Sequence, residues 1–245
     1  MSPRRQQVPP EDRRQNRWGA PVVAVIAFAM VGCASAPPPP PLDLGPPFDQ
    51  RAELASLVRR TAVSTPTEIR FEWTAAEPGP QRATGRGVAR IQGPENARLD
   101  LFLSNGEPVL VAALVGEDLR IPPGIDGSMA PPPLMLWALL GVFRQSSNLM
   151  IVDGSRSPDG GVGLSLRTQV GGEYEVLSQG GTLTLMERTE AGRLIEDVQI
   201  EPGTDYRFPK TARYRHYPNN RELSVTTISV RTVDHFPPDT WNPGG

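Results

Sequence analysis

The sequence has very few of the side chains that bind metals or form disulfides. Its 245 residues include one cysteine and two histidines. A single cysteine excludes an intramolecular disulfide framework, and so few ligands exclude most protein-ligated zinc, copper and iron–sulfur sites. Aromatic residues make up only 6% of the chain, whereas glycine (24) and proline (28) are abundant. This composition favours short strands joined by turns over a helical bundle.

The apolar run near the N-terminus is too short for an ordinary membrane-spanning helix. It covers residues 22–31, whereas a spanning helix needs roughly 20 apolar residues. The segment before it, residues 1–21, carries five arginines and two acids. A positive segment, a short apolar run and small residues after it are typical of a secretory signal peptide. We therefore expect residues 1–32 to be a signal peptide.

The only cysteine, Cys33, stands directly after this run. The sequence Met30–Ser35 resembles a bacterial lipobox, which implies that the thiol of Cys33 takes a diacylglyceryl group. The small Gly32 would give the signal peptidase access to the bond before Cys33, and membrane lipid would hold the acylated end at about 0.8 kcal/mol per buried CH₂. Ala34, which is not aspartate, implies sorting to the periplasmic face of the outer membrane. The alternative is an uncleaved anchor with an incidental cysteine.

The chain after the signal peptide is mildly acidic and begins with a proline-rich stretch. Without residues 1–32 it has 20 basic and 25 acidic residues, a formal charge of −5. With no basic stripe interleaved with aromatics, nucleic acid is not expected as a partner. Residues 33–47 have proline at positions 37–41, 46 and 47. This favours a semi-rigid polyproline stalk, with a proline-motif ligand as the alternative.

Hydrophobic spacing predicts one helix followed by many strands. Residues 48–60 are typical of a short amphipathic helix, and from Thr67 onward apolar residues alternate with polar ones. The predicted strands cover 68–73, 81–91, 96–103, 108–115, 118–121, 162–167, 173–178, 181–187, 193–200, 211–217 and 221–235. In the last strand Leu223 and Val225 share one phase, and Ile228 and Val230 share the other. A β-bulge at residues 226–227 would restore the inward face.

A second helix is predicted within the strand series. Residues 131–133 are prolines, and the apolar run 134–143 follows, with Gly141 near its end. Because this segment is apolar nearly all round, it cannot lie unprotected on a wet surface. It would be a lid or plug, an interfacial segment on a membrane, or an ordinary part of the core. The lid candidates are Leu136, Trp137, Leu140 and Phe143.

The order of elements over residues 48–238 resembles the lipoprotein-localisation-factor (LolA/LolB-like) superfamily. It implies an α+β fold: a half-open, strongly curved antiparallel β-barrel of about eleven strands, with an N-terminal helix and an inserted apolar lid or plug helix. The domain would cover residues 48–240, followed by a tail at 241–245. The family's outer-membrane receptor carries an exposed apolar residue between its third and fourth strands, but the loop at 104–107 here has none. A divergent lipoprotein of the same fold is therefore expected instead of that receptor.

Small inward residues on a curved sheet would leave volume for an apolar ligand. We expect this cavity to be lined by Ala83, Gly85, Gly87, Ala89, Leu99, Leu101, Leu103, Leu164 and Leu166. The alternative is that larger residues opposite fill the space, or that the small residues mark a bend in the sheet.

The sequence has none of the common catalytic motifs: no G-x-S-x-G elbow, no P-loop and no HExxH. His216 and His235 are typical of surface or edge histidines, and Asp153 and Asp159 of solvated turns. The expected protein is therefore a lipid-anchored, non-enzymatic envelope lipoprotein without a cofactor. It would bind a lipid or the acyl chains of a lipoprotein, in trafficking to the outer membrane. The alternative is an adaptor with a filled barrel whose outer surface binds an envelope protein.

Overall fold

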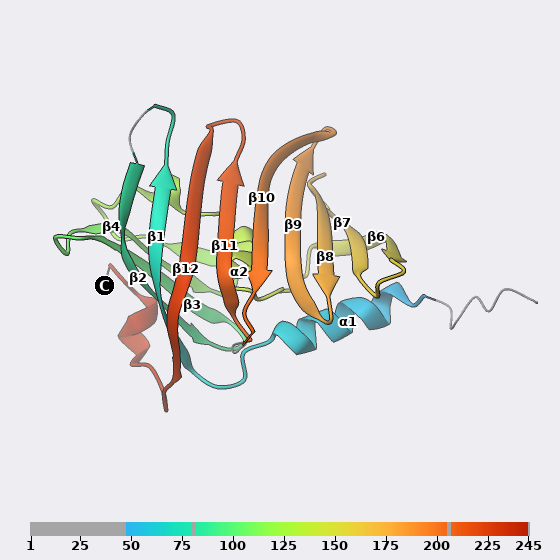
Figure 1. Ribbon diagram of the computed structural model, residues 1–245, viewed down its shortest axis with the longest axis horizontal. Coiled ribbons are helices and arrows are strands. Elements are labelled where there is room, and N and C mark those ends of the chain that lie inside the picture. The colour runs from blue at the N-terminus through green and yellow to red at the C-terminus, as the bar shows by residue number, and fades with distance from the viewer. Residues whose placement is uncertain (1–47, 80–81, 205–206, 245) are drawn as a thin grey trace, which may run out of the picture. The chain divides into compact units, whose positions relative to one another are not determined.

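The computed structural model describes residues 48–79, 82–204 and 207–244 (Figure 1). The predicted signal peptide, Cys33 and the stalk at 33–47 lie outside the described residues. Within the described part of the chain, no helix has both the length and the apolar character needed to cross a membrane.

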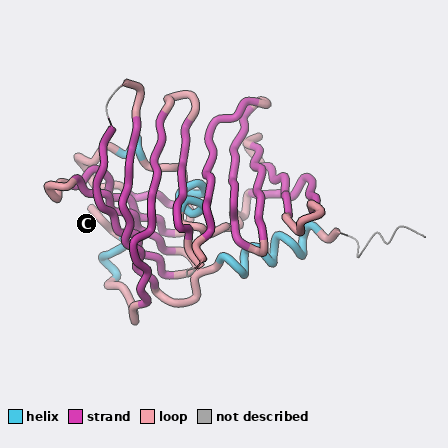
Figure 2. Tube along the Cα trace, in the orientation of Figure 1, coloured by secondary structure: helices cyan, strands magenta, loops and turns pink. Residues whose placement is uncertain are grey.

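The described strands form one antiparallel sheet (Figure 2). Their order in the sheet is β5-β4-β3-β2-β1-β12-β11-β10-β9-β8-β7-β6. The strands are β1 (Thr67–Ala76), β2 (Arg82–Gln92), β3 (Asn96–Leu103), β4 (Pro108–Val115), β5 (Asp118–Arg120), β6 (Leu149–Arg156), β7 (Val162–Thr168), β8 (Glu173–Gln179), β9 (Thr182–Glu190), β10 (Arg193–Pro202), β11 (Pro209–His216) and β12 (Arg221–Thr232). Neighbours in sequence are neighbours in the sheet, except that β1 pairs with β12 and that β5 and β6 form the two free edges. The sheet is curved and open, as the resemblance implied (Figure 1).

The connection between β5 and β6 must cross the inner face, because those strands are the opposite edges of the sheet. It carries the short helix η1 (Gly127–Met129) and then α2 (Pro133–Leu139). Proline at the first position starts α2, since its missing N–H would have no partner there. Gly141, at φ +76°, lets the chain turn away after the helix. α2 packs against β9, β10 and β11.

The first helix, α1 (Gln50–Thr61), begins at Asp49, whose carboxylate accepts hydrogen bonds from the backbone N–H groups of the first turn. It buries Leu54 and Leu57, whereas Ala52 in its first turn is exposed. The helix packs against β6, β7 and β9. Its apolar side thus covers the half of the sheet that ends at the β6 edge.

The strand β6 is the one that the sequence pattern missed. Its Asp153-Gly154 pair is a common turn signal, and Met150 and Val152 are about half exposed (51% and 52%). A register shift between Ile151 and Asp153 breaks its alternation. Gly154 is required because a Cβ there would lie 2.8 Å from the ring of Phe48, just before α1.

The predicted bulge in β12 is present, one residue later than expected. Arg70 pairs with Ser229 and Phe71 pairs with Thr227, so Ile228 is the extra residue. It is 52% exposed, whereas Val230 beyond it packs against the core. The bulge therefore restores the inward phase of the strand.

The last short helix, η2 (Pro238–Trp241), packs against β3 and β4. Trp241, at the start of the predicted tail 241–245, is only 7% exposed and meets the ring of Phe236 edge-on at 5.7 Å. Arg98 donates to the carbonyl of Thr240 at 2.9 Å. The packed domain therefore extends at least to Trp241.

Candidate functional site

The predicted cavity residues lie on the inner face of the sheet and belong to one apolar cluster. Those on β2 and β3 face each other in register: Gly85 with Leu103, Gly87 with Leu101 and Ala89 with Leu99. The residues from β7 come from the other side of the curved sheet and join the same cluster. The members with at most 1% exposure are Ala89, Leu99, Leu101, Leu164 and Leu166, and Ala83 and Leu103 are partly buried.

The space expected above Gly85 and Gly87 is occupied by aromatic side chains, which is the alternative that the sequence left open. Phe71 pairs with Gly87 and Trp73 with Gly85 across β1 and β2. A Cβ on Gly87 would overlap the ring of Phe71, and one on Gly85 would overlap the backbone carbonyl of Phe102 and lie 3.0 Å from Trp73 Nε1. The indole N–H donates to the carbonyl oxygens of Arg86 and Phe102, at 3.1 and 3.2 Å. The glycines thus make room for two large aromatic side chains.

All four lid candidates are buried against the inner face. Leu136, Trp137, Leu140 and Phe143 are at most 4% exposed. The segment after α2 is tied to α1, because the backbone N–H of Phe143 donates to Thr61 Oγ1 at 3.0 Å. In this conformation the segment fills the interior as a plug would.

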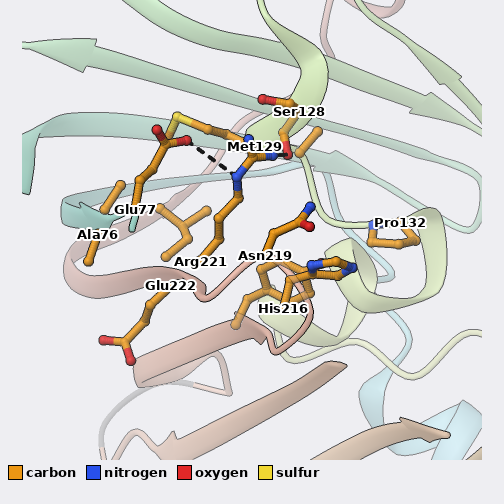
Figure 3. A pocket seen from close by; sticks show the side chains of 13 residues that line it. Ala76, Glu77, Ser128, Met129, Pro132, His216, Asn219, Arg221 and Glu222 are labelled. Carbon is orange, nitrogen blue, oxygen red and sulfur yellow. Dashed lines mark hydrogen bonds and ion pairs between the residues drawn. The ribbon is translucent and has the colours of Figure 1, made fainter. Parts of the chain in front are cut away.

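A small pocket, here called the mouth pocket, opens between the sheet and the segment that leads into α2 (Figure 3). Its volume is about 160 Å³. Arg221, at the start of β12, donates to the carbonyl oxygen of Ser128 at 2.8 Å and lies 3.4 Å from Glu77 Oε1. His216 and Asn219 lie beside each other on the side nearest α2 (Figure 3), and no group within hydrogen-bonding distance is described for His216 Nδ1. The apolar part of the lining is Ala75, Met129, Ala130, Pro132 and Leu223.

A second pocket, here called the rear pocket, lies at the other end of α2. Its volume is about 170 Å³. Trp137 lines it, and the guanidinium of Arg144 stands 5.5 Å from the centre of the indole ring. Arg144 also donates to the carbonyl oxygen of Pro94 at 2.6 Å. Within the described residues, the buried Trp137 Nε1 has no hydrogen-bond partner. The apolar part of the lining is Val58, Val63, Ile91, Val142 and Phe143.

A buried polar network on the inner face was not predicted. Glu196 is fully buried, and it accepts a hydrogen bond from the hydroxyl of Tyr214 at 2.6 Å and a charged hydrogen bond from Arg188. Burial, followed by the bond to Glu196, raises the pKa of Tyr214 well above its ordinary value. The alternation along β10 could have indicated this network, because Glu196 falls on the same inward-facing side of the strand as Val198 and Ile200.

The described residues contain no group of three His, Cys, Asp or Glu side chains placed to hold a metal ion. Asp153 accepts a hydrogen bond from Gln50 at 3.3 Å, and Asp159 accepts one from Ser157, so each carboxylate has a local partner. What the inner face offers is apolar surface with a small polar rim.

Comparisons with known proteins agree on the fold. No protein-family profile matches the chain, and no curated protein sequence matches it. Among solved structures it is similar to a LolA superfamily protein from Nitrosomonas europaea, with a TM-score of 0.55, 10% identity, and coverage of 80% of this chain and 98% of that one. It is also similar to a Vibrio parahaemolyticus structure described as a candidate outer membrane lipoprotein-sorting protein domain, with a TM-score of 0.56, 8% identity, and coverage of 80% and 98%. The fold is LolA-like. The resemblance drawn from the order of the elements is thereby confirmed.

Proposed function

We propose that this protein is a membrane-anchored lipoprotein that binds the apolar chain of a lipid or of another lipoprotein inside its LolA-like half-barrel. The mechanism is physical: apolar surface moves from water into a dry interior, at about 25 cal/mol per Å². The inner face, with its buried leucines on β3 and β7, supports this reading.

The observation that carries the proposal is the position of the α2 segment between two pockets. Ligand pockets commonly measure about 300–1,000 Å³, whereas the mouth and rear pockets measure about 160 and 170 Å³. Neither of these two pockets can hold a long acyl chain unless α2 moves. The segment is suited to moving, because a helix as short as Pro133–Leu139 has little stability of its own.

The exchange of α2 for a ligand is close to balanced in free energy. The ligand would cover the same inner surface of β9, β10 and β11 that α2 covers now, at about 0.8 kcal/mol per buried CH₂. The apolar side chains of α2 would lose a similar burial unless they packed elsewhere. A near-balanced exchange favours a carrier that takes up and releases its ligand, over a protein that stores it.

The expected lipid anchor would determine where in the cell envelope the carrier acts. Acylation of Cys33 and a stalk at residues 33–47 would hold the domain at the periplasmic face of the outer membrane, where it would serve lipid or lipoprotein trafficking. No step of this function requires a catalytic residue or a cofactor.

A second candidate function rests on the filled space above Gly85 and Gly87. If α2 never leaves the inner face, the barrel is an ordinary core. The protein would then be a non-catalytic adaptor whose outer surface binds an envelope protein.

The test uses the full-length protein, purified without a tag from cells that process lipoproteins. Its non-covalently bound lipid is extracted and identified, and the protein is titrated with a fluorescent fatty acid whose emission rises in apolar surroundings. The carrier function predicts co-purifying acyl lipid and saturable binding. A protein free of such lipid that also shows no saturable binding would be the adaptor.

A matched pair of variants locates the binding. Met129→Trp fills the mouth pocket and is expected to reduce uptake strongly, whereas Ile228→Trp adds the same ring on the exposed bulge of β12. Equal uptake by the two variants would place the fatty acid somewhere other than the half-barrel.

A further inference from the structure

The outer face of the sheet carries a row of three carboxylates on adjacent strands. Glu175 on β8 pairs in register with Glu187 on β9, and Glu187 pairs with Asp197 on β10. Like charges placed directly opposite each other destabilise a sheet. We call Glu175, Glu187 and Asp197 the acidic row.

Two other buried carboxylates on the outer face, Glu68 and Asp100, are neutralised by arginines, and this distinguishes them from the acidic row. Glu68 lies within 3.1 Å of Arg70 and 2.9 Å of Arg231, and Asp100 lies within 2.5 Å of Arg90 and 2.8 Å of Arg98.

Among the described residues, no arginine or lysine forms an ion pair with a carboxylate of the acidic row. Glu175 accepts a hydrogen bond from the hydroxyl of Ser165 at 2.7 Å, and Glu187 has no hydrogen bond or ion pair to a described side chain. The row therefore carries unneutralised negative charge.

Asp197 is buried with one oxygen unused. It is 1% exposed, and its Oδ2 accepts from Tyr217 at 3.1 Å and from Gln199 at 3.0 Å. Its Oδ1 has no partner among the described residues. Arg215 pairs with Asp197 in register, but its Nε lies 3.3 Å from Glu222 on the far side. A buried carboxylate oxygen without a partner is costly, and a cationic donor would satisfy it.

The surroundings of the row indicate what kind of cation fits. Leu177, two residues from Glu175 along β8, is 37% exposed, and Tyr217, at the Asp197 end of the row, is 40% exposed. The described carboxylates are not placed to hold a metal ion. A side-chain cation carried on a partly apolar chain matches both the charge and the exposed apolar surface.

We propose that the acidic row is a docking site for a basic segment of another protein, which inserts a lysine or arginine side chain toward Asp197 and Glu187. The apolar stem of that side chain would lie on Tyr217, whose hydroxyl donates to Asp197. The site is on the outer face, so it does not depend on whether the half-barrel binds a lipid.

The experiment measures binding of an oligolysine peptide to the full-length protein by calorimetry at moderate salt. The double variant Glu187→Gln with Asp197→Asn keeps the side-chain shapes and is expected to weaken binding about tenfold. Glu201→Gln is the matched control, because it removes a charge from β10 that Lys210 already neutralises at 2.8 Å. Its effect should stay below about threefold.

A third variant tests the same site in the opposite direction. Arg215→Met removes the arginine that pairs in register with Asp197 and should tighten oligolysine binding. The proposal is overturned if the double variant loses no more affinity than Glu201→Gln, or if Arg215→Met fails to tighten binding. Displacement of the peptide by stoichiometric Ca²⁺ would also overturn it, since the row would then be a metal site.

Discussion

Arg221 donates a hydrogen bond from Nη1 to the carbonyl oxygen of Ser128 at 2.8 Å. Ser128 lies in η1, on the segment that carries α2 across the inner face, so this bond fixes one end of that segment to the sheet. Glu77 forms an ion pair with the same guanidinium, with 3.4 Å between Glu77 Oε1 and Arg221 Nε (Figure 3). Arg221 is thus a tether across the mouth pocket.

Removing the tether should speed uptake of an apolar ligand. Arg221→Met keeps the aliphatic stem but loses the hydrogen bond, which contributes about 1 kcal/mol, or about fivefold in rate. Stopped-flow mixing with a fluorescent fatty acid measures the change. Arg213→Met is the control, because Arg213 bonds to Gln199 on the outer face. Unchanged uptake by Arg221→Met would mean that opening at this end does not limit binding.

The filled space above Gly87 predicts a clear cost for adding a side chain there. Gly87→Val should destabilise the fold by about 1–3 kcal/mol, because the new atoms overlap the ring of Phe71. Thr84→Val, an exposed position on the same strand, should change stability by less than about 0.5 kcal/mol. Urea unfolding of both variants measures the difference. A Gly87→Val protein as stable as the parent would restore the open cavity that the sequence predicted.

Gly85 and Gly87 show how much of the candidate site could be predicted from the sequence. Alternation correctly indicated that Gly85 and Gly87 face inward, because phase along one strand is a local property. What lies above them depends on the strand opposite, and the register that sets Phe71 against Gly87 comes from the β1–β2 pairing. The sequence therefore predicted the face and not its filling.

The edge strand β6 and the contacts between residues far apart in the sequence could not be predicted either. The Asp153-Gly154 pair suggested a turn, but it lies within β6, where the glycine makes room for Phe48. The tether joins Arg221 to Ser128, 93 residues apart, and no local pattern pairs them. The succession of elements along the chain, apart from β6, and the two α-helices could be predicted because both arise from short-range periodicity.

Trp137 should report the movement of α2. Its indole is 2% exposed, and its Nε1 has no partner among the described residues. Binding of a non-fluorescent fatty acid should shift tryptophan emission to the red as α2 leaves the core. Trp137→Phe should lose that shift, while Trp241→Phe, which changes the ring in η2, should keep it. An unaltered shift in Trp137→Phe would show that α2 stays in place.

Replacing Trp137 should also cost little stability. A buried donor without an acceptor carries a penalty of about 1–3 kcal/mol, and Trp137→Phe removes that penalty while it loses part of the ring's packing. The two effects oppose each other, so we expect a net loss below about 1 kcal/mol. Large aromatic-to-alanine changes in a core cost about 3–5 kcal/mol, so Trp137→Ala gives the contrast.

The acidic row should give the protein a distinctive dependence of stability on pH. Burial, and then the charges of Asp197 and Glu175, raise the pKa of Glu187 above its ordinary value of 4.5. A raised pKa in the folded state contributes stability that is fully present below 4.5 and is lost as pH rises through the folded value. Glu187→Gln should therefore be more stable than the parent at neutral pH, and this advantage should shrink as the pH falls.

Glu201 on the same face should behave in the opposite way. Its bonds to Lys210 and Thr211 lower the pKa of Glu201, so its contribution is present above the ordinary value and is lost as pH falls through the folded value. Glu201→Gln should be less stable than the parent at neutral pH and equal to it in acid. Urea unfolding of both variants across the acid range measures the two slopes. Slopes of the same sign would contradict the assignment of Glu187 as an unneutralised carboxylate.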